Sequence, residues 1–250
     1  MNGNTADDPP RPSPNGGPTF FAPTLWGGGE QPRSVLSPED RAMLAIIATV
    51  VRFRKGERIY DEGAPADAVF NIVIGVVKSC NSGPNGQENV VGFLFPHDII
   101  GLAENGKYIN SAKAVTDVTL YRLPTAALEA RMQRNPGLDF QIISKLCHDL
   151  RAAQQHGFLL HKQRAIAKLA LFLEMLETHR NGSNGPSGEI QLPMTRVDIG
   201  AYINISPESV SRAFRELVKR GAIRMRSRRA VEIADRAALE AAVSEIDGAA

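Results

Sequence analysis

The 250-residue chain has few cysteines, a single tryptophan and no long uninterrupted apolar run. Its two cysteines are Cys80 and Cys147, whereas a 4Fe–4S cluster needs four thiolates or equivalent ligands. We therefore expect neither a disulfide pair nor an iron–sulfur cluster. No stretch approaches the roughly 18 apolar residues of a membrane span, and the N-terminus lacks the pattern of a secretory signal. These absences predict a cytoplasmic chain without a membrane partner.

Motifs of common enzyme classes and metal sites are also missing. The sequence has no GxSxG nucleophile elbow, no Walker loop and no zinc signature, so we predict no catalytic residues and no enzyme. His148, His156 and His161 share one predicted helix, but their spacings of eight and five differ from the four of a helical metal pair. No metal site is predicted.

The first half of the chain divides into an arm and a region of strands. Residues 1–33 are rich in Pro, Gly, Asn and Asp without apolar periodicity, which predicts a disordered arm. Residues 34–135 begin with a short helix from Ser37 to Ile46. The best predicted strands are Val50–Phe53, Arg58–Tyr60, Val69–Ile74, Val76–Cys80, Val90–Leu94 and Val115–Leu123. Many short strands at near-regular spacing predict a β-sandwich or β-roll.

Residues 136–162 are predicted to form one long helix. Its apolar residues recur at a/d-type spacings over about three heptads, which favours a dimer contact between two such helices. The predicted dimer seam consists of Ile143, Leu146, Leu150, Ala153, Gly157 and Leu160. Packing of this helix on its own strand region stays open as the alternative. Cys147 lies beside the seam, where oxidation would add bulk and polarity, and it is the candidate for a redox role.

Residues 163–237 carry the most informative pattern. An amphipathic helix from Gln163 to Thr178 comes first, and the helix-turn-helix motif lies at residues 196–215. Thr195 with Asp198 three residues later is typical of a helix start, as is Ser206 followed by Pro207. A basic hairpin follows the second helix, which ends at Gly221. The layout predicts a winged helix-turn-helix, and residues 238–250 are expected to form a tail.

Charge is concentrated in this segment although the whole chain carries a formal net charge of only +2. Between residues 193 and 230 nine basic and three acidic residues leave a net charge of +6. A basic patch on a groove-sized helix and wing is typical of a protein that binds phosphate backbones. The predicted DNA backbone contacts are Thr195, Arg196, Ser206, Ser209, Arg215, Lys219, Arg228 and Arg229.

The segment MTRVDIGAYINISPESVSRAFREL resembles the Fnr and FixK branches of the Crp/Fnr family of bacterial transcription regulators. The resemblance places Glu208, Ser211 and Arg212 at the base-contacting positions of the recognition helix, which share one helix face. Pro207 stands where the cyclic-AMP-responsive branch has a guanine-reading arginine, which implies TTGA-type half-sites instead of GTGA. The resemblance further implies a homodimer that binds double-stranded DNA, contacts RNA polymerase and acts as an activator.

The upstream region RKGERIYDEGAPADAVFNIVIGVVK is similar to the cyclic-nucleotide-binding-like β-roll of that family. The fold class is therefore α+β, with an N-terminal double-stranded β-roll, a long dimerisation helix and a C-terminal winged helix-turn-helix. Leu102 and Asn110 stand where nucleotide-binding members carry an acidic residue and an arginine, so we expect an effector other than cyclic AMP, or none. Haem stays an alternative cofactor, with His97 as a candidate ligand.

Two other functional classes stay open beside this interpretation. The first is a small-molecule-binding regulatory subunit that acts on a partner protein instead of DNA, and Glu208, Arg212 and the basic wing argue against it. The second is a cupin-type metalloenzyme, which would need clustered histidine and carboxylate ligands that the predicted strands lack.

Overall fold

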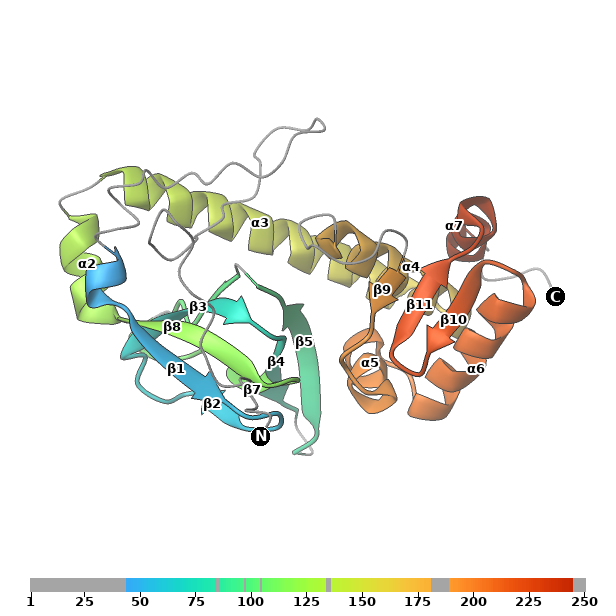
Figure 1. Cartoon of the computed structure of the whole chain (residues 1–250), viewed down its shortest axis with the longest axis horizontal. Coiled ribbons are helices and arrows are strands. Elements are labelled where there is room, and N and C mark those ends of the chain that lie inside the picture. The colour runs from blue at the N-terminus through green and yellow to red at the C-terminus, as the bar shows by residue number, and fades with distance from the viewer. Residues whose placement is uncertain are drawn as a thin grey trace, which may run out of the picture.

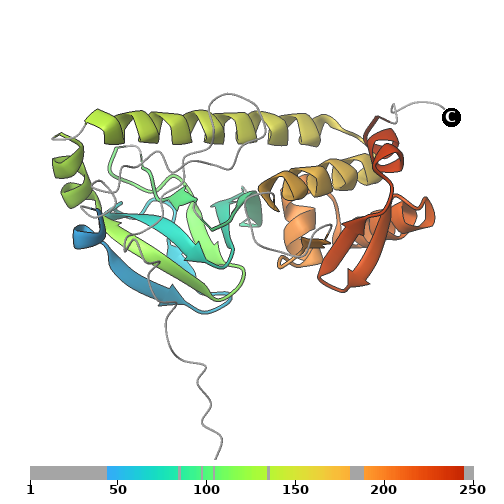
Figure 2. The same cartoon turned by 45° about the horizontal axis from the view of Figure 1, so that its top comes forward.

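A computed structural model describes residues 44–83, 86–96, 98–103, 105–133, 136–180 and 189–244. A β-roll and a C-terminal head lie beside each other, and the long helix α3 (Pro136–His161) runs along both (Figures 1 and 2). The predicted arm at residues 1–33 and the start of the predicted helix at Ser37 lie outside the described residues, whereas residues 44–47 are helical. The observed class is the predicted α+β arrangement.

Two four-stranded sheets form the roll. One has the order β1-β8-β3-β6 and the other the order β2-β7-β4-β5. Their bounds are β1 Thr49–Phe53, β2 Arg58–Tyr60, β3 Ala68–Ile74, β4 Val77–Ser82, β5 Glu88–Leu94, β6 Ile99–Ile100, β7 Ser111–Ala114 and β8 Val118–Pro124. The interior between the sheets contains Ile72, Val77 and Leu120, which are fully buried. The β-branched residues that predicted the strands thus supply the core.

The strand pattern in the sequence was misread at one place. Val115–Leu123 was predicted as one strand, but the chain turns at residues 115–117, and the flanking strands β7 and β8 belong to different sheets. Asp117 attaches this turn to the segment between β1 and β2, because its Oδ1 accepts a hydrogen bond from the Lys55 amide at 2.8 Å. The short strands β6 and β7 and the helix α2 (Thr125–Met132) were not predicted.

The head contains four helices and a three-stranded sheet of order β10-β11-β9. Its elements are α4 Ala165–Arg180, β9 Glu189–Gln191, α5 Arg196–Ile203, α6 Pro207–Lys219, β10 Ile223–Ser227, β11 Ala230–Ile233 and α7 Arg236–Ser244. Helix α7 extends past residue 238, where the tail was predicted to begin. Leu239 and Ala242 are buried in it, because α7 packs on α4. The head therefore ends later than predicted.

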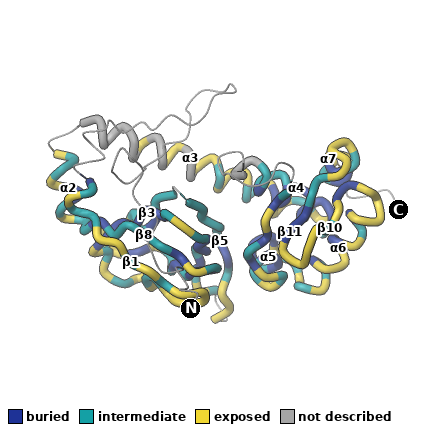
Figure 3. The backbone as a smooth tube through the Cα atoms, viewed as in Figure 1, coloured by how far each residue is buried: buried dark blue, intermediate teal, exposed yellow. Residues whose placement is uncertain are grey.

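Burial separates the inner and outer faces of these elements (Figure 3). Helix α6 buries Val210, Phe214 and Leu217 and leaves its polar face exposed. A single buried cluster joins the head to residues on the outer face of the roll, including Val76, Cys80 and Val90. The roll and the head are therefore packed together and are not merely connected by α3. None of the described helices is both long enough and apolar enough to span a membrane.

Candidate nucleic-acid interface

Helix α5 begins with the predicted cap. The Thr195 Oγ1 accepts a hydrogen bond from the Asp198 amide at 3.1 Å, and the Thr195 amide donates to Asp198 Oδ2 at 3.0 Å. This reciprocal pair is a capping box, which satisfies two amide groups at the helix start. The helix ends at Asn204, whose φ of 53° lies in the left-handed region. Asparagine tolerates this conformation, but its role as a cap was not predicted.

Helix α6 begins at the predicted Ser206–Pro207 pair. The Ser206 Oγ accepts a hydrogen bond from the Ser209 amide at 3.2 Å, while Pro207 occupies a position that needs no amide donor. The helix ends before Gly221, whose φ of 73° is unfavourable for a residue with a side chain. Local contacts therefore fix both ends of α6. With the ends fixed, the helical repeat determines which side chains lie on its exposed face.

The three predicted base-contacting residues lie together on the exposed face of α6. Glu208, Ser211 and Arg212 are all exposed to solvent. The Ser211 hydroxyl donates to the Pro207 carbonyl at 3.0 Å, and the Arg212 Nη2 donates to Ser209 Oγ at 3.0 Å. Ser209 of the same helix thus orients the Arg212 side chain. The side chains of Glu208 and Arg212 remain accessible to solvent. A hollow of about 410 Å³ is lined by Pro207, Glu208, Ser211, Arg212 and Arg215.

Arg196 is held more firmly than the sequence indicated. Its guanidinium carbon lies 3.4 Å from the centroid of the Phe214 ring, a cation–π contact between the two helices of the motif. Burial lowers the pKa of Arg196 below its ordinary value. Arg196, Ser211 and Arg215 line a second hollow of about 540 Å³ beside β10, where two cations face one space.

The arginines of the wing fall into two groups. Arg224 and Arg226 are tied to Glu232 across the hairpin, at 3.7 and 2.5 Å. Arg228 and Arg229 lie at the hairpin turn and are exposed, as is Lys219 at the end of α6. Of the predicted backbone contacts, Arg215, Lys219, Arg228 and Arg229 thus present accessible cations. Thr195 and Ser206 instead use their hydroxyl groups as helix caps within the protein.

Comparison with known proteins agrees with this geometry. Residues 167–242 match the model of the Crp-like helix-turn-helix domain, and residues 50–135 match that of the cyclic nucleotide-binding domain. The nitrogen fixation regulation protein FixK of Bradyrhizobium diazoefficiens is 31% identical over 69% of this chain and 73% of its own length. FixK of Azorhizobium caulinodans is also 31% identical, over 79% of this chain and 80% of its own length.

The chain belongs to the Crp/Fnr family. The solved structure of FixK2 from Bradyrhizobium japonicum matches with a TM-score of 0.73 and 28% identity, over 82% of this chain and 99% of that one. Together with the exposed recognition helix, these matches make the chain a DNA-binding transcription regulator. A regulatory subunit that acts on a partner protein instead of DNA is not favoured.

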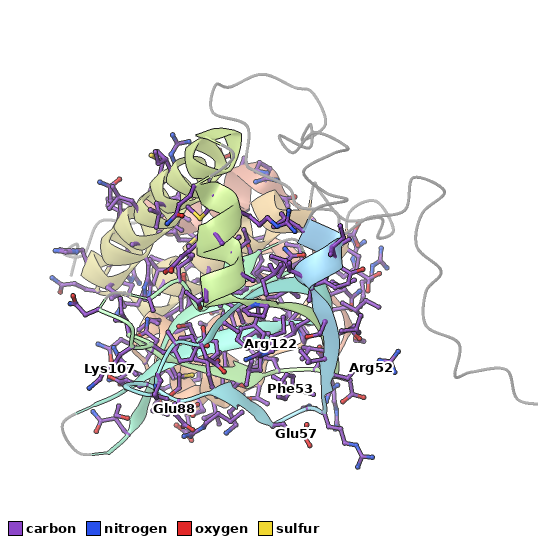
Figure 4. The ribbon with its side chains drawn as sticks, turned by 90° about the vertical axis from the view of Figure 1, so that its left-hand side faces the viewer. Arg52, Phe53, Glu57, Glu88, Lys107 and Arg122 are labelled. Atoms are coloured by element: carbon purple, nitrogen blue, oxygen red, sulfur yellow. The ribbon has the colours of Figure 1, made fainter. Side chains whose placement is uncertain are left out.

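The roll of this Crp/Fnr protein contains two cavities that share Tyr60 and Tyr108. These rings are stacked with centroids 4.0 Å apart. One cavity, of about 340 Å³, is bounded by residues that include Ser79, Asn110 and Leu146 of α3, and none of the described residues around it is charged. The lining of the other, of about 470 Å³, includes Phe53 and Arg122, which are labelled in Figure 4. Arg122 is paired with Asp67 at 2.6 Å.

The remaining candidate residues are spread over the Crp/Fnr protein. Cys80 is buried, and burial raises the pKa of its thiol to about 12, whereas Cys147 is exposed on α3. His97 lies outside the described residues. Within the described ranges no three His, Cys, Asp or Glu side chains are grouped to hold a metal ion.

Sequence reasoning missed the residues that join the head to the roll and to α3. Lys78 of β4 donates to Asp198 of α5 at 2.8 Å, and Phe93 of β5 packs on Tyr202 of α5 with ring centroids 5.4 Å apart. His156 of α3 stacks on Tyr202 at 4.1 Å, and its Nε2 lies 2.7 Å from the Tyr202 carbonyl oxygen. No local signal marks these residues, because each partner is distant in sequence.

Proposed function

We propose that the chain binds palindromic DNA with TTGA-type half-sites as a homodimer. The observation that carries this proposal is the grouping of Glu208, Ser211 and Arg212 on the exposed face of a capped helix. Arginine can donate two hydrogen bonds to guanine, and glutamate can accept one from cytosine. Pro207 directly before Glu208 has no side-chain donor, so no further guanine contact is available from that position.

Dimerisation through α3 supplies the symmetry of the site. Three large apolar residues of the predicted seam, Ile143, Leu146 and Leu150, are 55%, 51% and 61% exposed in the single chain. Contact with the same helix of a second copy would remove them from water. Two heads held by such a dimer would reach successive major grooves about 34 Å apart, which matches a palindrome.

The accessible cations are assigned to the DNA backbone. Arg215 and Lys219 lie on the recognition helix, and Arg228 and Arg229 lie at the turn of the wing. Arg196 and Arg215 face the hollow of about 540 Å³. Each phosphate that they neutralise would release a counterion, so binding would weaken with salt. The relative named as transcriptional activator protein anr, of Pseudomonas aeruginosa, supports the role of an activator. Contact with RNA polymerase is part of the same proposal.

The effector is a different matter from DNA recognition. A cyclic nucleotide carries a charged phosphate, and a buried phosphate needs a charged or bidentate partner. The described residues around the 340 Å³ cavity offer Ser79 and Asn110 as polar groups. We therefore assign this cavity to an uncharged ligand or to none. Calorimetric titration with cyclic AMP is expected to give no heat of binding, and binding at micromolar concentration would contradict the assignment.

A binding selection on random duplex DNA tests the main proposal. Purified protein at fixed salt is expected to recover palindromes of TTGA-type half-sites. Arg212→Ala should weaken the selected palindrome by about 1–3 kcal/mol and relax the preference at one base pair. Arg229→Ala is the matched control, because it removes an arginine at the wing and should weaken all sequences equally. Recovery of GTGA palindromes, or equal losses on specific and random DNA for Arg212→Ala, would overturn the proposal.

A further inference from the structure

The contact between the roll and α5 is made of two matched pairs. Lys78 on β4 and Phe93 on β5 are directly opposite each other in the sheet, so their side chains share one face. Asp198 and Tyr202 are four residues apart on α5, so they share one face of that helix. Lys78 meets Asp198, and Phe93 meets Tyr202. Two contacts at different points along α5 fix its direction, which a single contact would not.

Lys78 is unusual for a lysine because only 8% of its surface is exposed. Its ammonium group donates to Glu88 of the neighbouring strand β5 and to Asp198 of the head. Burying an ammonium is costly unless it is paired and hydrogen-bonded. The two carboxylates satisfy that requirement only while the head is docked, because Asp198 belongs to the head. If the head moved away from the roll, Lys78 would keep only Glu88 of its own sheet as a partner.

Asp198 links this contact to the helix-turn-helix itself. Its Oδ1 accepts from Lys78, while its Oδ2 accepts from the Thr195 amide and hydroxyl, at 3.0 and 2.6 Å. One carboxylate thus caps the first helix of the motif and attaches that helix to the roll. The docked head leaves Glu208, Ser211 and Arg212 exposed, so the docked arrangement is open to DNA.

We infer that Lys78 is a positioning residue, which holds the DNA-binding head in its DNA-competent orientation through Asp198. The effect of Lys78 on DNA affinity rests on the proposed dimer and its palindromic site. The effect of Lys78 on the position of the head does not depend on that proposal. Two heads must be set at a fixed separation to bind two half-sites at once, whereas a single half-site needs only one head. Lys78 should therefore matter for the palindrome and not for the half-site.

The variant Lys78→Met removes the ammonium and keeps an apolar side chain of similar length. Lys113→Met is the matched control, because Lys113 lies opposite Lys78 on β7 and its Nζ is 3.9 Å from the same Glu88. Lys78→Arg keeps the positive charge, so it should behave more like the parent protein than like Lys78→Met. Thermal unfolding of all three variants establishes that each is folded.

The position of the head is measured first, without DNA, by spin labels on the exposed residues 55 of the roll and 240 of α7 in a Cys147→Ser background. The distribution of distances between the two labels is expected to be broad in Lys78→Met, and to be narrow in Lys113→Met and in the parent protein. An unchanged narrow distance in a folded Lys78→Met would overturn the inference, whatever the DNA results.

Affinity for a full palindrome and for a single half-site is measured next. Lys78→Met should lose about tenfold in palindrome affinity, within the usual range of coupling between sites, with half-site affinity unchanged. Equal losses on both duplexes would show that Lys78 supports only the fold of the head, and would overturn the inference. A parent protein that gains nothing from the second half-site would instead contradict the proposed dimeric function, and the distance measurement would still decide the role of Lys78.

Discussion

Truncating Leu150 in the exposed stripe of α3 should separate the two protomers. Leu150 is 61% exposed in the single chain, and Ile143 and Leu146 are 55% and 51% exposed. Full burial of such a side chain contributes roughly 1.5–3 kcal/mol, so the half that remains exposed represents about 1 kcal/mol for each residue. A contact that uses the same residue in both protomers loses this amount twice. Leu150→Ala should therefore weaken the dimer by about 2 kcal/mol, or roughly 30-fold in its dissociation constant.

Sedimentation equilibrium over a range of protein concentrations measures this constant directly. Leu150→Glu should have a larger effect than Leu150→Ala, because two carboxylates would face each other in an apolar seam. Val197→Ala is the matched control, since Val197 is 63% exposed but lies on α5 instead of α3. If Leu150→Glu sediments as the same dimer as the parent protein, the seam on α3 is wrong and dimerisation must use another surface.

Three further predictions concern the helix-turn-helix, the wing and the contact between domains. Gly200→Ala should destabilise the head by about 1–3 kcal/mol in thermal unfolding, because the added carbon would lie 2.6 Å from the Ile205 carbonyl oxygen, which cannot easily move. Arg228→Ala should reduce the slope of log affinity against log salt by about one, and an unchanged slope would mean that it meets no phosphate. Burial would raise the pKa of Asp198, but hydrogen bonds from Lys78 and Thr195 outweigh burial and lower it below its ordinary 3.8. The stabilisation from this carboxylate is thus present above pH 3.8 and is lost as the pH falls through its lower pKa in the folded protein. The distribution of spin-label distances in the parent protein should therefore broaden only below pH 3.8, and Lys78→Met should show no such step.

Local chemistry made the motif readable from the sequence. Thr195 and Ser206 cap the two helices of the motif, and Gly221 takes the left-handed conformation after the second. Each of these roles depends on neighbours within four residues, so the sequence contains all the information needed. The same reason explains why most strands of the roll were recognised from their β-branched runs.

Features that depend on distant residues could not be predicted in the same way. The run from Val115 to Leu123 is apolar enough for one strand, but its first three residues form the turn that links β7 in one sheet to β8 in the other. Lys78 and Asp198 are 120 residues apart, and neither has a local signature, so their contact follows from the packing of the roll on the head. Helix α7 begins with Arg236, whose partner Glu177 lies on α4. Tertiary contacts thus decide the elements that composition leaves ambiguous.

Strand β4 brings the cavity of the roll close to the contact that positions the head. Successive side chains of a strand point to opposite faces, and here Ser79 borders the 340 Å³ cavity while the preceding Lys78 reaches α5. Leu146 of α3 borders the same cavity and is half exposed in the proposed dimer seam. A ligand can regulate only if it binds two arrangements of the protein with different affinities. A cavity between β4 and α3 borders both the strand that positions the head and the helix of the proposed dimer contact. If β4 carries the coupling, a small uncharged ligand that changes the ratio of palindrome to half-site affinity in the parent protein should leave that ratio unchanged in Lys78→Met. An equal response in both proteins would assign the coupling to α3 alone.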